Sequence, residues 1–276
     1  METVRAYWNV IWVLWRRDLL HYWRNRVRAI VGLTMPMIWL FVFGSGMSAS
    51  FSRGADTFNQ PGVDYIQFIF PGVMVMSMIF NAIFSALDTV KDKEFGFLKE
   101  ILVAPVPRST IVFGRSLGAA STAAIQATLI LILAPFVGVH LSIPTILALV
   151  PTIWLVALSL AAIGILLAAG FDNQEGFQFV VNFVNMPMFF LSGALFPLAQ
   201  LPGWMEILVR LNPASYAVDA MRRIVLHGQG LATTAINQLS FTVLGHNLSL
   251  GFDIILLMVF SAVLIMIAAN RFSRPR

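Results

Sequence analysis

Long apolar stretches separated by short polar segments make up most of the chain. Each stretch has about the 20 mostly apolar residues that an α-helix needs to cross the hydrocarbon core of a bilayer. There are six of them: residues 29–47, 65–87, 116–139, 144–169, 177–196 and 252–270. The pattern therefore predicts an all-α integral membrane protein with six transmembrane helices.

Composition agrees with a location in the membrane. Hydrophobic residues make up 58% and charged residues 11% of the 276 residues, and the mean hydropathy is +0.82. A soluble domain needs roughly 25% charged residues to cover its surface.

The net charge is +5, but the basic residues lie at the ends of apolar stretches and form no basic and aromatic surface, so we expect no nucleic-acid partner. Cysteine is absent, which excludes disulfides and thiolate metal ligands.

The distribution of lysine and arginine predicts the orientation. Six lie in segment 1–28, five in 91–115 and three in 271–276, which places fourteen of the 18 on one face. The other four are Arg53, Arg210, Arg222 and Arg223. Because basic residues accumulate on the cytoplasmic side, we expect both termini and the connection 91–108 to be cytoplasmic.

The segment ahead of the first stretch has a helical period. Its large apolar residues recur at spacings of three and four: Trp8, Ile11, Trp12, Trp15, Leu19 and Tyr22. Arginines fall elsewhere on the helical wheel. This pattern is typical of a helix in the membrane interface, with tryptophans at the level of the lipid headgroups and arginines within reach of lipid phosphate.

The region between the fifth and sixth stretches begins too apolar for an ordinary loop. Two amphipathic segments are separated by Asn212 and Pro213. We expect two short external helices that dip into the outer leaflet as re-entrant helices, buried in protein. Asp219 and Arg223 are spaced to form an ion pair on the second of them.

The connection 91–108 reads KDKEFGFLKEILVAPVPR and combines dense mixed charge with a helical period. As a helix it would carry one apolar face, formed by Phe95, Leu98, Ile101 and Leu102. Proline lacks an amide hydrogen, so Pro105 and Pro107 end the helix. A half-apolar helix tied to two membrane spans is suited to docking into another protein. A solvated loop whose charges only set the topology is the alternative.

Polar residues recur within the second and fifth stretches. The second carries Met74, Ser77, Asn81, Ser85 and Asp88 at helical spacing, and the fifth carries Asn182, Asn185, Met186 and Phe189, with a kink expected at Pro187. Because burying an amide in lipid is unfavourable, these residues should face protein or a cavity. They either line a translocation path or join helices through hydrogen bonds.

Three segments resemble the type 2 ATP-binding-cassette export permeases. They are KEFGFLKEILVAPVPRSTIVFGRSLG (93–118), FFLSGALFPLAQLPGWM (189–205) and LNPASYAVDAMRRIV (211–225). Phe97 replaces the small hydroxylated residue usual after the glycine. The resemblance covers nearly the whole chain and implies a single transmembrane domain. Its parts are an interfacial helix (1–28), two spans (29–90), a cytoplasmic coupling helix (91–108), three spans (109–196), an external re-entrant region (197–250) and a last span with a tail (251–276).

The resemblance also implies partners. The chain lacks the phosphate-binding loop GxxxxGK[ST], so a separate cytoplasmic ATPase subunit would bind ATP and Mg²⁺, and the chain itself would hold no cofactor, metal or catalytic site. Two copies of the chain, as a homodimer, would join two ATPase copies in the inner membrane of a bacterium. The residues that would contact the ATPase are Glu94, Phe95, Gly96, Leu98, Lys99, Glu100, Ile101, Leu102 and Pro105. The path would be lined by Met74, Ser77, Asn81, Ser85, Asn182, Asn185, Met186 and Phe189.

The expected cargo is an amphipathic small molecule such as a drug or antibiotic. A polysaccharide, lipid-linked sugar or lipo-oligosaccharide is the alternative. A secondary transporter is a further alternative, but such carriers usually need an ionisable residue near mid-membrane, whereas Asp88 and Asp253 lie at the ends of their stretches. An intramembrane enzyme is disfavoured, because the four histidines are scattered and neither HExxH nor GxSxG occurs.

Overall fold

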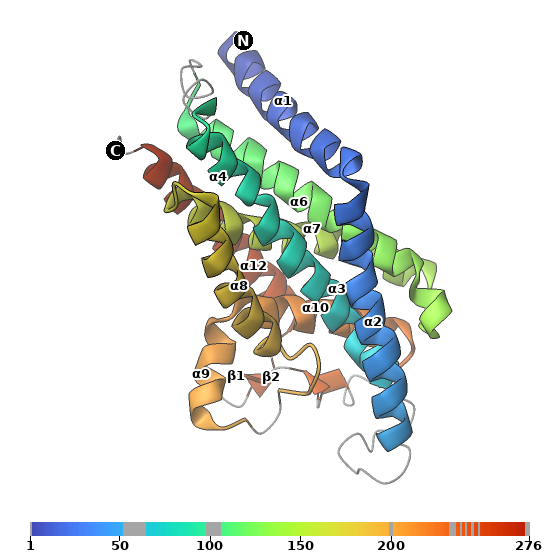
Figure 1. The fold of residues 1–276 in the computed structure, drawn as a ribbon. Helices are drawn as coiled ribbons and strands as arrows, with labels where there is room; N and C mark the ends of the chain where they lie inside the picture. Colours follow the sequence, from blue (N-terminus) through green and yellow to red (C-terminus); the bar gives the residue numbers. More distant parts are fainter. Residues whose placement is uncertain are drawn as a thin grey trace.

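The computed structural model is a bundle of helices (Figure 1). It describes residues 2–51, 65–97, 106–198, 201–231, 236–237, 239–240, 242–243, 246–247 and 249–273. The two chain termini and the tip of α4 lie at one end of the bundle, and helix α9 and strands β1 and β2 lie at the other. This arrangement fits an even number of crossings.

Within the described residues, five helices are long and apolar enough to cross a bilayer. They contain α2 (Arg26–Phe51), α3 (Tyr65–Ser85) with its continuation α4 (Leu87–Glu94), α6 (Arg108–Ile132), α7 (Ile143–Ala169) and α12 (Leu250–Ser273). The predicted third span was placed too late: α6 begins at Arg108, and the 3-10 helix η2 (Ala134–Val137) follows it. The α3–α4 unit has 30 residues, which gives a length of about 45 Å at 1.5 Å per residue. It is therefore long enough to project beyond a hydrocarbon core about 30 Å thick.

The predicted fifth span, 177–196, differs from the structure at both ends. Helix α8 (Gln174–Phe190) begins three residues earlier and ends six residues earlier, and it has 17 residues. Pro187 lies in its last turn and offers no amide hydrogen, and Gly193 has a left-handed φ of 72° that a helix cannot continue. The sixth crossing therefore stays a prediction.

The predicted helix 91–108 is interrupted near its start, and residues 98–105 lie outside the described residues. Helix α4 ends at Glu94, and Gly96 has a φ of 81°. Phe95 is therefore exposed beyond the helix end and shares no continuous helix with the apolar residues that follow. Six predicted coupling residues lie outside the described residues: Leu98, Lys99, Glu100, Ile101, Leu102 and Pro105.

Helix α1 (Glu2–Arg24) confirms the predicted N-terminal helix and packs along α6. Gly114 of α6 allows the close approach, because a Cβ there would lie 3.3 Å from the Cα of Ile11. Trp15 Nε1 donates a hydrogen bond of 2.7 Å to Ser121 Oγ. The predicted apolar stripe is divided between two environments: Tyr22 is buried on α6, whereas Trp8 remains exposed. A location in the membrane interface stays a prediction for the exposed side.

The two helices predicted on either side of Asn212 are present, and their external, re-entrant location stays a prediction. Helix α9 (Gly203–Leu211) is followed by α10 (Pro213–Gly228), which packs against α3, α7 and α12. The predicted ion pair is confirmed, with Arg223 Nε 2.7 Å from Asp219 Oδ2. Beyond α10, β1 (Thr242–Val243) pairs antiparallel with β2 (His246–Asn247).

Side chains from the start of α10 and the preceding residue satisfy the carbonyl groups at the end of α8. Asn212 Nδ2 donates to Met188 O at 2.7 Å, and Ser215 Oγ donates to Leu191 O at 3.0 Å. Arg222 is fully enclosed and donates to Gly193 O at 2.6 Å, while its guanidinium lies 3.8 Å from the centre of the Phe68 ring of α3. Irregular backbone can lie at membrane depth only with such partners. The α8 end is therefore held by α10.

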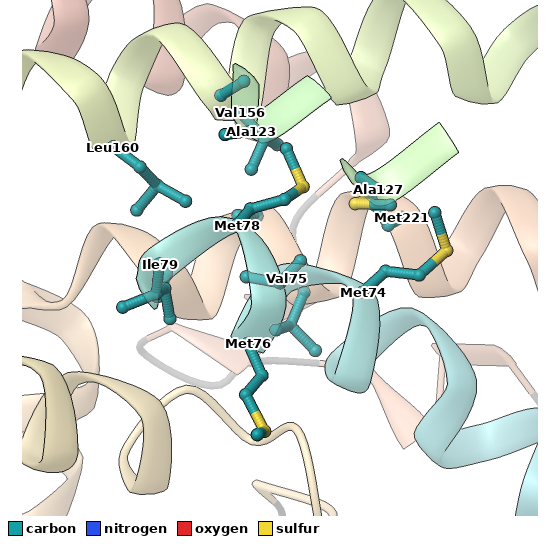
Figure 2. Close-up of a cluster of buried hydrophobic side chains, with 14 of the residues drawn as sticks. Met74, Val75, Met76, Met78, Ile79, Ala123, Ala127, Val156, Leu160 and Met221 are labelled. Atoms are coloured by element: carbon teal, nitrogen blue, oxygen red, sulfur yellow. The ribbon is translucent and has the colours of Figure 1, made fainter. Parts of the chain in front are cut away.

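Helix α3 is the centre of the bundle and contacts α2, α6, α7, α8 and α10. Figure 2 shows how its Met74 and Met78 reach toward other helices in the buried core. Their neighbours include Ala123 and Ala127 of α6 and Met221 of α10. Alanines on α6 let the backbones come close, and the flexible methionines fill the space that remains.

Gly72 offers a test of this packing. A Cβ at this position would lie 2.5 Å from both the Cα and the carbonyl oxygen of Ala194, so Gly72→Ala must displace backbone. We expect a lower melting temperature in detergent, corresponding to about 1–3 kcal/mol of overpacking. Gly46→Ala on α2 is the control, since among the described residues no atom outside the neighbouring backbone of α2 lies within 4 Å of its new Cβ. Equal melting temperatures for the two variants would contradict the packing of α3 on the turn after α8.

Candidate functional site

A groove of about 760 Å³ lies between α2, α3 and α8, and it extends along the start of α4. Apolar side chains line most of it, including Val31, Met35 and Trp39 of α2, Met76, Phe80 and Phe84 of α3, and Met186, Phe189 and Phe190 of α8. The volume lies in the range typical of small-molecule sites.

Aromatic rings join α2 to α8 across the groove. The ring of Trp39 meets that of Phe189 edge to face, with centroids 5.7 Å apart and planes at 77°. Trp39 also stacks on Phe43, with centroids 4.4 Å apart. Met186 of α8 lines the groove with an exposed side chain. A surface of methionine and aromatic rings can adapt to apolar ligands of different shapes.

The polar part of the groove wall comes from α3 and α6. Asn81 Nδ2 donates to Gln126 Oε1, and Asn81 Oδ1 accepts hydrogen bonds from Thr122 Oγ1 at 3.1 Å and from Ser85 Oγ at 3.3 Å. The hydroxyl of Tyr22 on α1 also donates to Gln126 Oε1, at 3.5 Å. Asn81 and Gln126 both line the groove. Asn81 therefore joins helices and also belongs to the groove wall, so the two predicted roles are not exclusive.

The groove has a charged end on the side of the chain termini. Asp88 and Lys91 of α4 line it there, and Lys91 Nζ lies 3.7 Å from Asp88 Oδ1. Asn25, between α1 and α2, also lines this end. The groove is thus amphipathic along its length.

Four of the eight predicted path residues line the groove: Ser77, Asn81, Met186 and Phe189. The other four lie elsewhere. Met74 is buried in the core, and Ser85 bonds to Asn81. Asn182 is exposed on α8 outside the groove. Asn185 is fully buried, and within the described part of the chain neither of its amide atoms has a hydrogen-bond partner.

A cluster of four charged residues joins α1, α4 and α6 beside the groove. We call Arg17, Asp18, Asp92 and Arg115 the charge cluster. The side chain of Arg115 is only 3% exposed and pairs with Asp18 Oδ1 at 3.0 Å and with Asp92. Arg17 Nη2 donates to Asp92 Oδ2 at 2.5 Å. Burial raises the pKa of the Asp18 carboxyl, and the neighbouring Arg115 and Arg17 oppose this rise. The attraction between the two carboxylates and the two guanidinium groups offsets the free-energy cost of burying these charges.

The next two residues of α4 contact the connection between α7 and α8. Lys93 Nζ donates to the carbonyls of Ala168 and Ala169, both at 2.9 Å, and to that of Phe171 at 3.2 Å. Glu94 Oε2 accepts from the backbone N–H of Gln174 at 3.1 Å. Glu94, which the sequence assigned to the coupling surface, therefore bonds within its own chain. Its role toward an ATPase stays a prediction.

Sequence reasoning missed Gln126, Arg115 and Arg222. A signal was present for Gln126, an amide in the middle of the third apolar stretch. Arg115 and Arg222 were counted only as topology signals at the ends of segments, yet both are buried. Asp253 was placed at the end of its span, but its carboxylate is also buried. Exposure cannot be read from a single charged residue in the sequence, because it depends on which helix packs against it.

The role of Asn81 in stability can be measured. Asn81→Leu removes its bonds to Gln126, Thr122 and Ser85 and leaves their buried polar atoms without these partners. We expect a loss of about 1–3 kcal/mol in unfolding free energy, measured as a lower melting temperature in detergent. Asn182→Leu is the matched control, since that amide is exposed on α8, and its melting temperature should stay unchanged. A stable Asn81→Leu variant would contradict the helix-joining role.

Comparison with known proteins identifies the family. The pattern of the ABC-2 type transporter family matches residues 9–226. The chain is 29% identical over 257 residues to the putative transport permease ycf38 of Cyanophora paradoxa, covering 92% of this chain and 85% of that protein. It is 32% identical over 224 residues to nodulation protein J of Rhizobium meliloti (strain 1021), covering 79% of this chain and 82% of that protein. The chain belongs to the ABC-2 type transporter family.

Proposed function

We propose that this chain is the membrane permease subunit of an ATP-driven exporter and forms the path of an amphipathic small molecule such as a drug or antibiotic. The amphipathic groove between α2, α3 and α8 is the observation that carries the proposal. Its methionine and aromatic lining suits an apolar body, and Asn81 and Gln126 offer uncharged hydrogen-bonding groups. Membership of the transporter family supports the rest of the proposal.

Polysaccharide, lipid-linked sugar or lipo-oligosaccharide is the alternative cargo. A hydrated sugar chain requires many polar contacts along its path, whereas the polar groups of this groove are confined to one wall and one end. A secondary transporter is disfavoured on similar grounds. The charged residues that line the groove, Asp88 and Lys91, lie at its end and pair with each other.

In the proposed assembly a separate ATPase subunit binds ATP and Mg²⁺ and contacts residues 98–105 on the cytoplasmic side. Two permease copies join two ATPase copies in the inner membrane of a bacterium, with both termini cytoplasmic. Helix α8 completes the sixth crossing. The apolar faces of α2 and α8 are exposed in the single chain, at Phe41, Val42, Phe179 and Phe183 among others, and the second copy or lipid covers them.

The ATPase contact is tested by substituting two apolar residues of the segment. Leu98→Asp together with Leu102→Asp should abolish co-purification of the ATPase while the chain remains inserted and folded, because two carboxylates would enter an apolar interface. Leu98→Met together with Leu102→Met preserves volume and apolarity and should retain the ATPase. Retention by the aspartate variant would show that this segment does not form the contact.

The groove is tested by filling it. Met186→Trp replaces a thioether chain by a bulkier indole ring in the groove, and Met258→Trp places the same ring on an exposed face of α12. The two methionines are comparably exposed, at 53% and 46%. We expect only Met186→Trp to lower ATP-dependent transport at low cargo concentration by roughly tenfold, the effect of about 1.4 kcal/mol of lost binding free energy. Equal transport by both variants would place the path elsewhere.

A further inference from the structure

Three successive charged residues at the end of α4 contact five other parts of the fold. Asp92 contacts α1 and α6, Lys93 contacts the end of α7 and a ring of α12, and Glu94 contacts the start of α8. We infer that Asp92, Lys93 and Glu94 are positioning residues that convert a displacement of segment 98–105 into a movement of the groove-lining helices. The inference rests on the proposed function, in which an ATPase displaces that segment.

Asp92 joins α4 to two helices at once. Its carboxylate accepts from Arg17 of α1 and pairs with Arg115 of α6 in the charge cluster. Its side chain is only 13% exposed, so it faces its own chain and not a partner subunit. Separating a buried carboxylate from its partners is strongly unfavourable, so α1 and α6 should follow α4 when it moves.

Lys93 joins α4 to the end of α7. Its ammonium donates to the carbonyls of Ala168 and Ala169 in the last turn of α7, where a helix lacks intrahelical donors, and to that of Phe171 just beyond the helix. A cation there also interacts favourably with the helix dipole. The ammonium lies 5.1 Å from the centre of the Phe272 ring on α12. Its ion pair with Asp172 is long, at 3.9 Å, and Asp172 is 66% exposed, so this pair contributes little.

Glu94 connects α4 to a helix that lines the groove. It accepts from the N–H of Gln174, the first residue of α8, where free donors and the helix dipole favour a carboxylate. The same helix carries Met186 and Phe189 into the groove. A displacement of α4 toward or away from Gln174 is therefore transmitted along a single helix to the groove wall.

The turn that follows separates the contact with the ATPase from the contacts within the chain. Gly96, with its φ of 81°, changes the direction of the backbone two residues after Glu94. Asp92 and Lys93 point into the chain, while Phe95 and Phe97 are exposed beyond the helix end. The side chains that hold the groove-lining helices are thus different from those that would meet a partner.

The absence of cysteine allows a direct test in the intact permease–ATPase complex. Met186→Cys introduces a single thiol in the groove, and its alkylation rate on the permease chain is measured with and without ATP. We expect the parent to show an ATP-dependent rate. Lys93→Met and Glu94→Ala should each abolish this ATP dependence and reduce transport per ATP hydrolysed by roughly fivefold or more, with normal amounts of co-purified ATPase.

Three control variants separate positioning from a general structural effect. Glu94→Gln keeps an oxygen that can accept from Gln174 and should retain the response. Asp172→Asn removes the long ion pair to Lys93, and Glu175→Ala removes another acid in the first turn of α8. Both should behave like the parent. The melting temperature of each variant identifies any loss of folding, and Glu94, with an exposed side chain, is the variant least subject to it.

The outcomes distinguish the inference from the proposed function. A parent that co-purifies with no ATPase and shows no ATP-dependent alkylation overturns the proposed function and the inference with it. A parent that responds, with Lys93→Met and Glu94→Ala responding equally, overturns the inference alone. Loss of the ATPase from these two variants also overturns it, because the side chains would then belong to the subunit interface.

Discussion

A helix that ends within a bundle leaves carbonyl groups and N–H groups without intrahelical partners, and side chains from other segments can satisfy them. This constraint determines much of the present fold. Lys93 donates hydrogen bonds to carbonyl groups at the end of α7, and Glu94 accepts one from the first N–H of α8. Asn212 and Arg222 donate to carbonyl groups at and after the end of α8. Each contact joins segments that are distant in the sequence, and together they define how the helices sit around the groove.

Helix α8 shows the consequence for function. Its first N–H bonds to α4, and the carbonyls at and after its last turn bond to the start of α10 and to Arg222. Between these two attachments it presents Met186 and Phe189 to the groove. A short helix held at its two ends by polar contacts can move as a unit when either attachment moves. In the proposed ATP-driven permease this arrangement would link the segment that contacts the ATPase to the proposed cargo groove.

Local patterns in the sequence predicted the features that depend on local spacing. Apolar length located most of the long helices, Asn212 marked the break between α9 and α10, and the spacing of Asp219 and Arg223 predicted their ion pair. Half of the expected path residues line the groove: Ser77 and Asn81 of α3, and Met186 and Phe189 of α8. Periodicity identifies a polar face without saying which part of it meets a cavity.

The remaining features depend on contacts between distant segments. The charged residues around Lys93 and Glu94 were interpreted as a surface for a partner, because sequence does not reveal that the α7–α8 connection packs against them. The helix assigned to 91–108 is interrupted at Gly96. The apolar residues keep a helical spacing in the sequence on both sides of this glycine, but the backbone turns there. Arg115 and Arg222 were assigned by position to loops and segment ends, whereas tertiary packing encloses both.

The most direct measurement of the central claim is transport by purified components in sealed vesicles. The permease is reconstituted with its ATPase, and uptake of a fluorescent amphipathic drug into inside-out vesicles is followed with ATP, without ATP, and with an imposed proton gradient alone. The account predicts uptake that requires both subunits and ATP hydrolysis. Uptake by the permease alone, driven by the proton gradient and indifferent to ATP, would contradict it and establish a secondary transporter.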